Sequence, residues 1–118
     1  MKPTLRLFFV NDDGEKVFGE GPYRLLKGIE ATGSMRCSAN DMQMAYSKAL
    51  RILKRAEDAI GAPLTERAVG GRDGGGSRLT PAGKELITRY EAYRSRCQSA
   101  CDAYWHEFFD EFQNKNEI

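Results

Sequence analysis

The apolar positions of the first third of the chain predict a β-hairpin followed by a helix. Residues 5–10 (Leu-Arg-Leu-Phe-Phe-Val) are rich in strand formers, and Val17-Phe18 follow an Asp13-Gly14 pair, which favours a hairpin turn. Pro22 suits the first turn of the helix that comes next, and Gly33 suits its end. The apolar face of this helix consists of Leu25, Leu26 and Ile29.

Two further helices are predicted between residues 34 and 60. Ser34 can cap a short helix that runs to about Asp41, and a brief turn at Met42-Gln43 leads to a longer helix over residues 44–60. The apolar residues of the longer helix recur every three or four positions, as one buried face requires; they are Ala49, Leu53, Ala56 and Ile60. The polar side carries Ser47, Lys48, Arg51, Lys54, Arg55 and Asp58, and Gly61-Ala62-Pro63 ends the helix.

Residues 64–80 predict a second hairpin. Residues 64–69 form a short strand candidate, residues 70–77 form a glycine-rich loop, and residues 78–80 form the returning strand. The loop and its flanks carry Arg67, Arg72 and Arg78. Glycine lets a backbone approach a phosphate closely, so this hairpin suits phosphate or minor-groove contact. An ordinary flexible hairpin is the alternative.

A last helix is predicted from Pro81 to about Gln113, roughly 50 Å long at 1.5 Å per residue. Its apolar stripe exceeds what a core of this size can cover, so we expect a second subunit to cover it. The alternative is that the helix folds back on its own domain. The expected dimer interface consists of Leu86, Tyr90, Tyr93, Cys97, Cys101, Tyr104, Trp105, Phe108 and Phe112.

The distribution of charge is more informative than its total. The net charge is +1 over 118 residues, but residues 34–80 hold 8 Lys/Arg and 5 Asp/Glu (+3), and residues 102–118 hold 5 Asp/Glu and 1 Lys (−4). A polyanion is therefore expected to prefer the middle of the chain. Because no run of about 18 apolar residues and no signal-peptide pattern occurs, we expect a cytoplasmic protein without a membrane span.

Short helices joined by a tight turn and followed by a two-stranded hairpin are typical of a winged helix-turn-helix. The N-terminal turn of the helix over residues 44–60 would then enter the major groove of DNA, where Tyr46 and Ser47 can contact base edges or phosphates. Lys48 and Arg51 lie on one face, and arginine can bind a guanine with two hydrogen bonds. The alternative is a solvated side of a core helix.

Other chemistry finds little support in the sequence. Gly71 and Gly76 have the spacing of a phosphate-binding loop, but Ser77-Arg78 stand where Lys-Ser/Thr is needed. Cys97 and Cys101 share a helix face without the further ligands of a structural zinc site, and nothing catalytic surrounds His106, the only histidine. We expect no metal, no cofactor and no enzyme activity; a redox or metal-responsive switch through the two cysteines stays an alternative.

Several segments together resemble a known family. They are residues 31–34 (Ala-Thr-Gly-Ser), 44–49 (Met-Ala-Tyr-Ser-Lys-Ala), 63–72 (Pro-Leu-Thr-Glu-Arg-Ala-Val-Gly-Gly-Arg), the glycines 74–76 and 79–83 (Leu-Thr-Pro-Ala-Gly). Over about residues 5–93 the chain resembles the N-terminal, LysR-like DNA-binding domain of ModE-type molybdate-responsive regulators. The resemblance places Tyr46, Ser47 and Lys48 on the recognition helix and Arg67 and Arg72 in the wing.

The resemblance also implies a dimer through the helix after the wing. The sequence departs from the family at Gln43, Ala45 and Leu50, where glycine, serine and tryptophan are usual, so the operator sequence is not carried over. Family members that sense molybdate carry further C-terminal domains. Because this sequence ends at Ile118, we expect no oxyanion-sensing domain and no molybdate binding.

We therefore expect an α+β, mostly helical fold: a winged helix-turn-helix with an N-terminal β-hairpin and a long C-terminal dimerisation helix. Residues 1–80 would form the DNA-binding domain and residues 81–118 the helix and a polar tail. The function expected is that of a homodimeric transcriptional regulator that binds double-stranded DNA; a winged-helix protein-interaction module with weak DNA contacts is the alternative. The expected DNA contacts are Ser34, Tyr46, Ser47, Lys48, Arg51, Arg67, Arg72 and Arg78.

Overall fold

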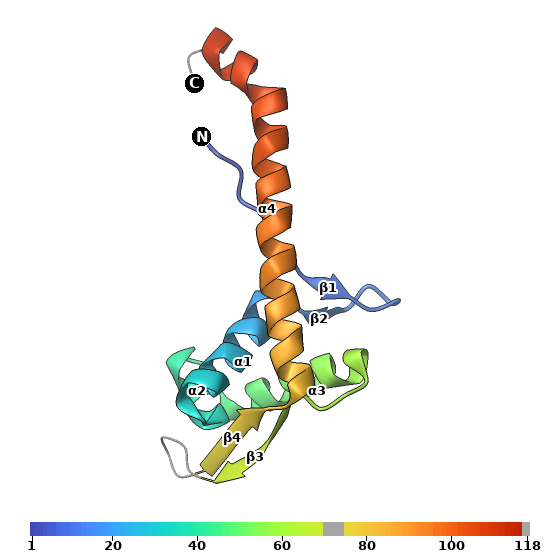
Figure 1. Ribbon diagram of the computed structural model, residues 1–118, viewed down its shortest axis with the longest axis vertical. Helices are drawn as coiled ribbons and strands as arrows, with labels where there is room; N and C mark the ends of the chain where they lie inside the picture. Colours follow the sequence, from blue (N-terminus) through green and yellow to red (C-terminus); the bar gives the residue numbers. More distant parts are fainter. Residues whose placement is uncertain (70–74, 117–118) are drawn as a thin grey trace.

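A computed structural model describes residues 1–69 and 75–116 of the chain (Figure 1). Over these residues the fold is α+β and mostly helical, with two small antiparallel sheets and four helices, as the sequence predicted. In chain order the elements are β1 (Phe9–Val10), β2 (Lys16–Phe18), α1 (Glu20–Thr32), α2 (Met35–Asp41), α3 (Tyr46–Ile60), β3 (Thr65–Val69), β4 (Gly75–Leu79) and α4 (Pro81–Asn116).

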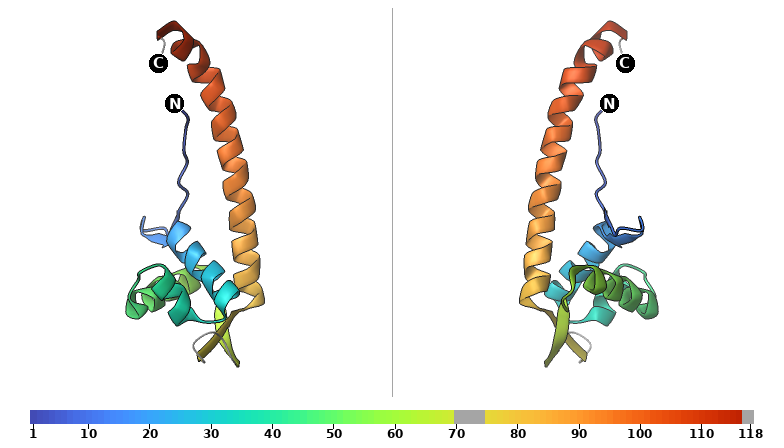
Figure 2. Two further views of the ribbon diagram at one scale, coloured as in Figure 1. Left: turned by 90° about the vertical axis from the view of Figure 1, so that its left-hand side faces the viewer. Right: turned by 90° about the vertical axis from the view of Figure 1, so that its right-hand side faces the viewer.

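The N-terminal hairpin is shorter than predicted. Strand β1 pairs with β2 over Phe9↔Phe18 and Val10↔Lys16, so residues 5–8 lie outside the strand expected over residues 5–10. Because β2 has only three residues, the preceding segment has no strand to pair with there. It lies instead beside α4 and runs antiparallel to it (Figure 2), and the Leu5 amide donates to Gln98 Oε1 at 3.0 Å.

Local chemistry sets the boundary between α1 and α2. Gly33 caps the C-terminus of α1 in the left-handed conformation at φ 71°, and the Ser34 hydroxyl accepts a hydrogen bond from the Cys37 amide at 3.1 Å. Leu25, Leu26 and Ile29 of α1 are fully buried, as predicted. The two helices pack closely because Gly28 of α1 faces Ser38 of α2, whose hydroxyl donates to the Leu25 carbonyl at 2.8 Å.

Helix α3 packs on the others through Ala49, Leu53 and Ala56, all buried, as its periodicity predicted. It begins at Tyr46, two residues after the predicted start. The prediction that Ile60 belongs to the buried face is wrong, since 42% of its surface is exposed. Ile60 is the last residue of α3, directly before the Gly61 cap, so it lies at the edge of the packed face.

The first turns of α4 complete the core. Ile87 and Tyr90 are buried, and the Tyr90 ring meets Phe18 edge-on with 5.2 Å between centroids. The Tyr90 hydroxyl donates to the Leu7 carbonyl at 2.9 Å. Further along, α4 leaves the packed part of the molecule (Figure 1). The protruding helix makes the molecule elongated, with overall extents of 60 × 31 × 23 Å. No helix within the described ranges is apolar over a length that could cross a membrane.

Candidate nucleic-acid interface

The polar side of α3 is exposed along the first half of the helix. Ser47, Lys48 and Arg51 are all exposed, whereas Ala49 and Leu53 on the other side are buried. Helical geometry places residues 47, 48 and 51 on one face, because residues three and four apart are neighbours. The structure therefore brings three of the predicted site residues together on a single exposed surface.

Tyr46, the fourth predicted residue on this helix, has a partner that the sequence analysis missed. The Arg36 guanidinium of α2 lies over the Tyr46 ring, 4.4 Å from its centroid. Arg36 is exposed, so this cation–π contact adds a positive charge next to the start of α3. Arg36 and Tyr46 are ten positions apart, and only the packing of α2 against α3 brings them together.

The turn between α2 and α3 depends on an unusual backbone conformation. Gln43 has φ 55°, in the left-handed region, and it is the only residue other than glycine with positive φ among the described residues. The Gln43 amide donates to the Asn40 carbonyl and the Met44 amide to the Ala39 carbonyl, both at 2.9 Å. Glycine adopts this conformation most readily, so Gln43 occupies a backbone position that favours glycine.

The β3–β4 hairpin carries two of the predicted arginines. The register pairs Arg67 with Ser77 and Glu66 with Arg78. Arg67 is exposed, whereas Arg78 forms an ion pair with Glu66 at 2.9 Å between Nε and Oε1. The positive charge of Arg78 is thus partly neutralised within the hairpin. Arg72 lies outside the described residues.

Hydrogen bonds fix this hairpin against the helices. The Ser77 amide of β4 donates to the Gly33 carbonyl at the end of α1 at 2.8 Å. The Thr80 hydroxyl donates to the Pro63 carbonyl at 2.7 Å and accepts from the Gly83 amide at 3.1 Å. Figure 1 shows the hairpin at the end of the molecule opposite the C-terminus of α4.

Ser34 does not belong to the exposed surface, contrary to the expected DNA contact. Its relative exposure is 0%, and its side chain caps α2 by accepting from the Cys37 amide. Because the hydroxyl is enclosed by its own domain, it is not accessible to a ligand in this structure. The role in helix capping that the sequence predicted for Ser34 is confirmed.

The apolar stripe of α4 divides into two parts. Tyr90 is 1% exposed and is covered by its own chain, and Leu86 is half-buried against the core. Further along, 62% of Tyr104 and 69% of Phe108 are exposed, and Tyr93 and Phe112 are also exposed. Cys97, Cys101 and Trp105 are half-buried, and the Trp105 ring stacks on Phe109 of the same helix at 4.5 Å.

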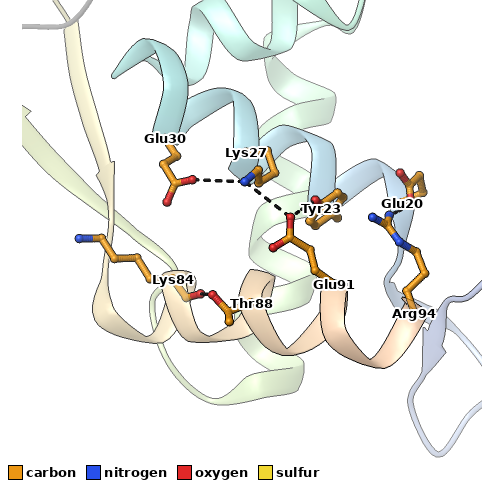
Figure 3. Close-up of polar contacts among 8 residues, drawn as sticks. All are labelled: Glu20, Tyr23, Lys27, Glu30, Lys84, Thr88, Glu91 and Arg94. Carbon is orange, nitrogen blue, oxygen red and sulfur yellow. Dashed lines mark hydrogen bonds and ion pairs between the residues drawn. The ribbon is translucent and has the colours of Figure 1, made fainter. Parts of the chain in front are cut away.

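Polar contacts hold the start of α4 against α1 (Figure 3). Arg94 Nη1 lies 2.7 Å from Glu20 Oε2. Glu91 accepts a hydrogen bond from the Tyr23 hydroxyl and forms an ion pair with Lys27, with 3.6 Å between Oε2 and Nζ. The hydrogen bond from Tyr23, with the Lys27 charge, lowers the pKa of Glu91 below its ordinary value. Burial, followed by the bond to Glu91, raises the pKa of Tyr23. These contacts fix the direction in which α4 leaves the domain.

No group of three or more histidine, cysteine or acidic side chains that could hold a metal ion occurs in the described part of the chain. The Nδ1 atom of His106 lies 2.9 Å from Asp110 Oδ1, one turn along α4. Both side chains are exposed, which is typical of an ordinary helix-surface pair.

Comparison with known proteins identifies relatives for part of the chain, although no protein-family model matches it. The molybdenum transport protein ModE of Azotobacter vinelandii is 35% identical over 79 residues, which cover 67% of this chain and 29% of that protein. The DNA-binding transcriptional dual regulator ModE of Escherichia coli is 36% identical over 90 residues, which cover 75% of this chain and 34% of that protein. The molybdenum-pterin-binding protein MopB of Rhodobacter capsulatus is 38% identical over 68 residues, covering 58% and 25%.

The chain thus spans about a quarter to a third of the length of the curated relatives it matches. These relatives are named as regulators, transport proteins or pterin-binding proteins and not as enzymes. Two of them, from Haemophilus influenzae and Escherichia coli, are named as transcriptional regulators.

Proposed function

The chain is a relative of ModE-type molybdate-responsive regulators over part of their length, and we propose that it is the DNA-binding part of a transcriptional regulator. In this proposal α2, the Gln43 turn and α3 form a helix-turn-helix, and the β3–β4 hairpin is its wing. The partner is double-stranded DNA, bound by a homodimer. The observation that carries the proposal is the exposed polar face at the N-terminal half of α3.

The chemistry of α3 suits the major groove, which is just wide enough for a helix. Ser47, Lys48 and Arg51 supply a hydroxyl, an ammonium and a guanidinium on one exposed face. Arginine can bind guanine through two hydrogen bonds, and lysine can bind guanine or a phosphate. Arg36, beside Tyr46, is well placed to contact the DNA backbone near the start of the helix.

The hairpin would add contacts that position the protein without selecting a sequence. Arg67 is exposed on β3 and has the charge that a phosphate requires. Arg78 is a weaker candidate, because binding a phosphate would compete with its ion pair to Glu66. We therefore propose Arg67, rather than Arg78, as the principal phosphate contact among the described residues of the wing.

The homodimer is proposed from the distal part of α4. Tyr104, Phe108 and Phe112 leave about half or more of their surfaces in water. Large aromatic side chains have about 150–250 Å² to bury, so each such ring forgoes about 2–3 kcal/mol at 25 cal/mol per Å². Ordering of side chains and loss of rotational freedom offset part of this gain. A two-fold partner would cover the same stripe on both copies.

The test of DNA binding is fluorescence anisotropy with a DNA duplex enriched from a random library. We expect Lys48→Ala and Arg51→Ala each to weaken binding by about 1–3 kcal/mol if the lost side chain contacts a base. Arg89→Ala is the matched control, because Arg89 is exposed on α4 and, among the residues that the structure describes, pairs with Glu85 one turn away. If no duplex is enriched, or all three variants bind alike, the protein-interaction alternative is favoured.

The test of dimerisation is sedimentation velocity at micromolar concentration. We expect a dimer of the 13.3 kDa chain that Phe108→Glu converts to monomer, because the charge would be buried in the interface. Ala103→Glu is the control, since residue 103 is exposed and lies about 200° around the helix from Cys101. A monomeric wild-type protein would refute the proposed dimer.

A further inference from the structure

A cleft of about 760 Å³ lies between the N-terminal segment, β2, the start of α1 and α3. Its walls are residues 5–8, residues 16–22, Arg51, Ile52, Arg55 and Arg94. We call it the basic cleft. Small-molecule sites typically have volumes of about 300–1,000 Å³ and mostly apolar walls with a few polar groups, and the basic cleft falls within both limits.

The charged side chains of the basic cleft are nearly all cationic. Five are basic (Arg6, Lys16, Arg51, Arg55 and Arg94) and one is acidic (Glu20), which gives a net charge of +4. Glu20 already pairs with Arg94 at 2.7 Å. The remaining charge therefore favours an anionic occupant.

The cationic side chains of the basic cleft differ in whether they already interact with other groups of the protein. Lys16 Nζ lies 4.4 Å from the centroid of the Phe8 ring, and Arg55 Nη1 donates to the Lys16 carbonyl at 3.4 Å. Arg6 and Arg51 have no ion pair with a carboxylate among the residues that the structure describes. Both side chains are exposed at the wall and can turn toward an anion in the cleft.

Apolar groups line the space between these cations. Leu7, Val17 and Phe18 contribute from the hairpin and the segment before it, and Ile52 contributes from α3. A fully hydrated inorganic ion would leave this apolar surface without a partner. An anion with an apolar body satisfies both the charge and the apolar walls.

We propose that the basic cleft binds a small amphipathic anion, an aryl or alkyl carboxylate. Its carboxylate pairs with Arg6 and Arg51, and its apolar body lies against the side chains of the hairpin and Ile52. Because Arg51 also belongs to the proposed DNA-binding face of α3, an occupied cleft competes with DNA for this side chain. This last step rests on the proposed function; binding of the anion does not.

The experiment titrates the full chain with 2-naphthoate and, separately, with uncharged 2-naphthalenemethanol, followed by heteronuclear NMR. We expect naphthoate to shift the amides of residues 5–8, 16–22 and 51–55 and to bind more tightly than the alcohol. Arg6→Gln should weaken naphthoate binding about two- to fivefold, as expected for one exposed charge pair. Arg96→Gln, outside the cleft, should leave it unchanged.

A second variant blocks the cleft without removing a charge. A Cβ atom at Gly21 would meet nothing within 4 Å, so Gly21→Trp can extend into the open space that Gly21 lines. We expect this variant to remain folded and to lose naphthoate binding at least tenfold. Equal binding of acid and alcohol, or naphthoate binding unaffected by both Arg6→Gln and Gly21→Trp, would overturn the proposal.

The DNA arm is measured separately, by repeating the anisotropy titration with and without naphthoate. We expect saturating naphthoate to weaken DNA binding in the wild type but not in Gly21→Trp. If naphthoate binds and no duplex does, the proposed function fails while the anion site stands. If Gly21→Trp instead changes the sedimentation of the protein, the cleft is an interface between copies and the small-ligand proposal is wrong.

Discussion

The substitution Gly28→Ala should destabilise the protein, although alanine is the better helix former. A Cβ atom at position 28 would lie 2.0 Å from Ser38 Oγ and 2.8 Å from Ser38 Cβ. The first contact could be relieved by rotating the hydroxyl, but the second is fixed by the backbone of α2. The two helices would therefore have to separate, or Ser38 would lose its bond to the Leu25 carbonyl at 2.8 Å.

The expected magnitude combines three effects. Overpacking of a close contact costs about 1–3 kcal/mol, and loss of the hydrogen bond from Ser38, which is 1% exposed, costs about 1 kcal/mol more. Replacing glycine by alanine within a helix stabilises the helix by about 1 kcal/mol, which offsets part of this loss. The net loss of unfolding free energy is then about 1–3 kcal/mol. Each kcal/mol lost lowers the Tm of a domain of this size by roughly 3–6 °C.

The assay is urea unfolding followed by circular dichroism, with Gly21→Ala as the matched control. Gly21 lies in the same helix, but a Cβ atom there meets nothing within 4 Å, so this variant should be neutral or slightly stabilised. The double variant Gly28→Ala/Ser38→Gly should recover part of the loss, because it removes both short contacts. If Gly28→Ala unfolds at the same urea concentration as Gly21→Ala, the packing argument is wrong.

Three further outcomes are expected. Gly83→Ala should unfold at lower urea concentration by at least 1 kcal/mol, because its Cβ would lie 2.2 Å from the Leu64 carbonyl oxygen, a backbone atom. The hydrogen bond from Tyr23 lowers the pKa of Glu91 in the folded protein, so ionised Glu91 stabilises the fold above its unfolded pKa near 4.5. This contribution is lost as the pH falls through the lower folded pKa. The difference in unfolding free energy between wild type and Glu91→Gln, measured by urea titration, should therefore be larger at pH 7 than at pH 3. Arg67→Ala should weaken binding of all DNA sequences alike and reduce the slope of log K against log salt by about one unit, measured by anisotropy.

Helix boundaries were predictable wherever a local signal determines them. Gly33 ends α1, Ser34 caps α2 and Gly61 ends α3, as their residue types predicted. Each of these signals depends on the conformation of one residue and a hydrogen bond a few positions away, so no knowledge of the tertiary structure is needed. The later start of α3, at Tyr46 rather than residue 44, follows from the left-handed Gln43, which the sequence does not reveal by itself.

Properties that depend on packing were harder to predict. The sequence analysis predicts Ser34 both as the cap of α2 and as a DNA contact, but its complete burial is compatible only with the cap. Arg78 has the residue type of a phosphate contact, and only the strand register that places it opposite Glu66 shows that its charge is engaged. The sequence analysis did not identify Arg36 as a site residue, because its contact with Tyr46 exists only once α2 and α3 are packed.

The apolar stripe of α4 shows why periodicity alone could not assign a surface to a partner. The stripe continues without interruption past Tyr90, yet the structure covers its first part with the core and leaves Tyr104 and Phe108 exposed. The N-terminal segment contacts the helix at Gln98, whose Nε2 donates to the Pro3 carbonyl at 3.4 Å while its Oε1 accepts from the Leu5 amide, but 51% of Tyr93 stays exposed. A dimer interface proposed on this helix should therefore be centred beyond Gln98, on the aromatic residues that their own domain does not reach.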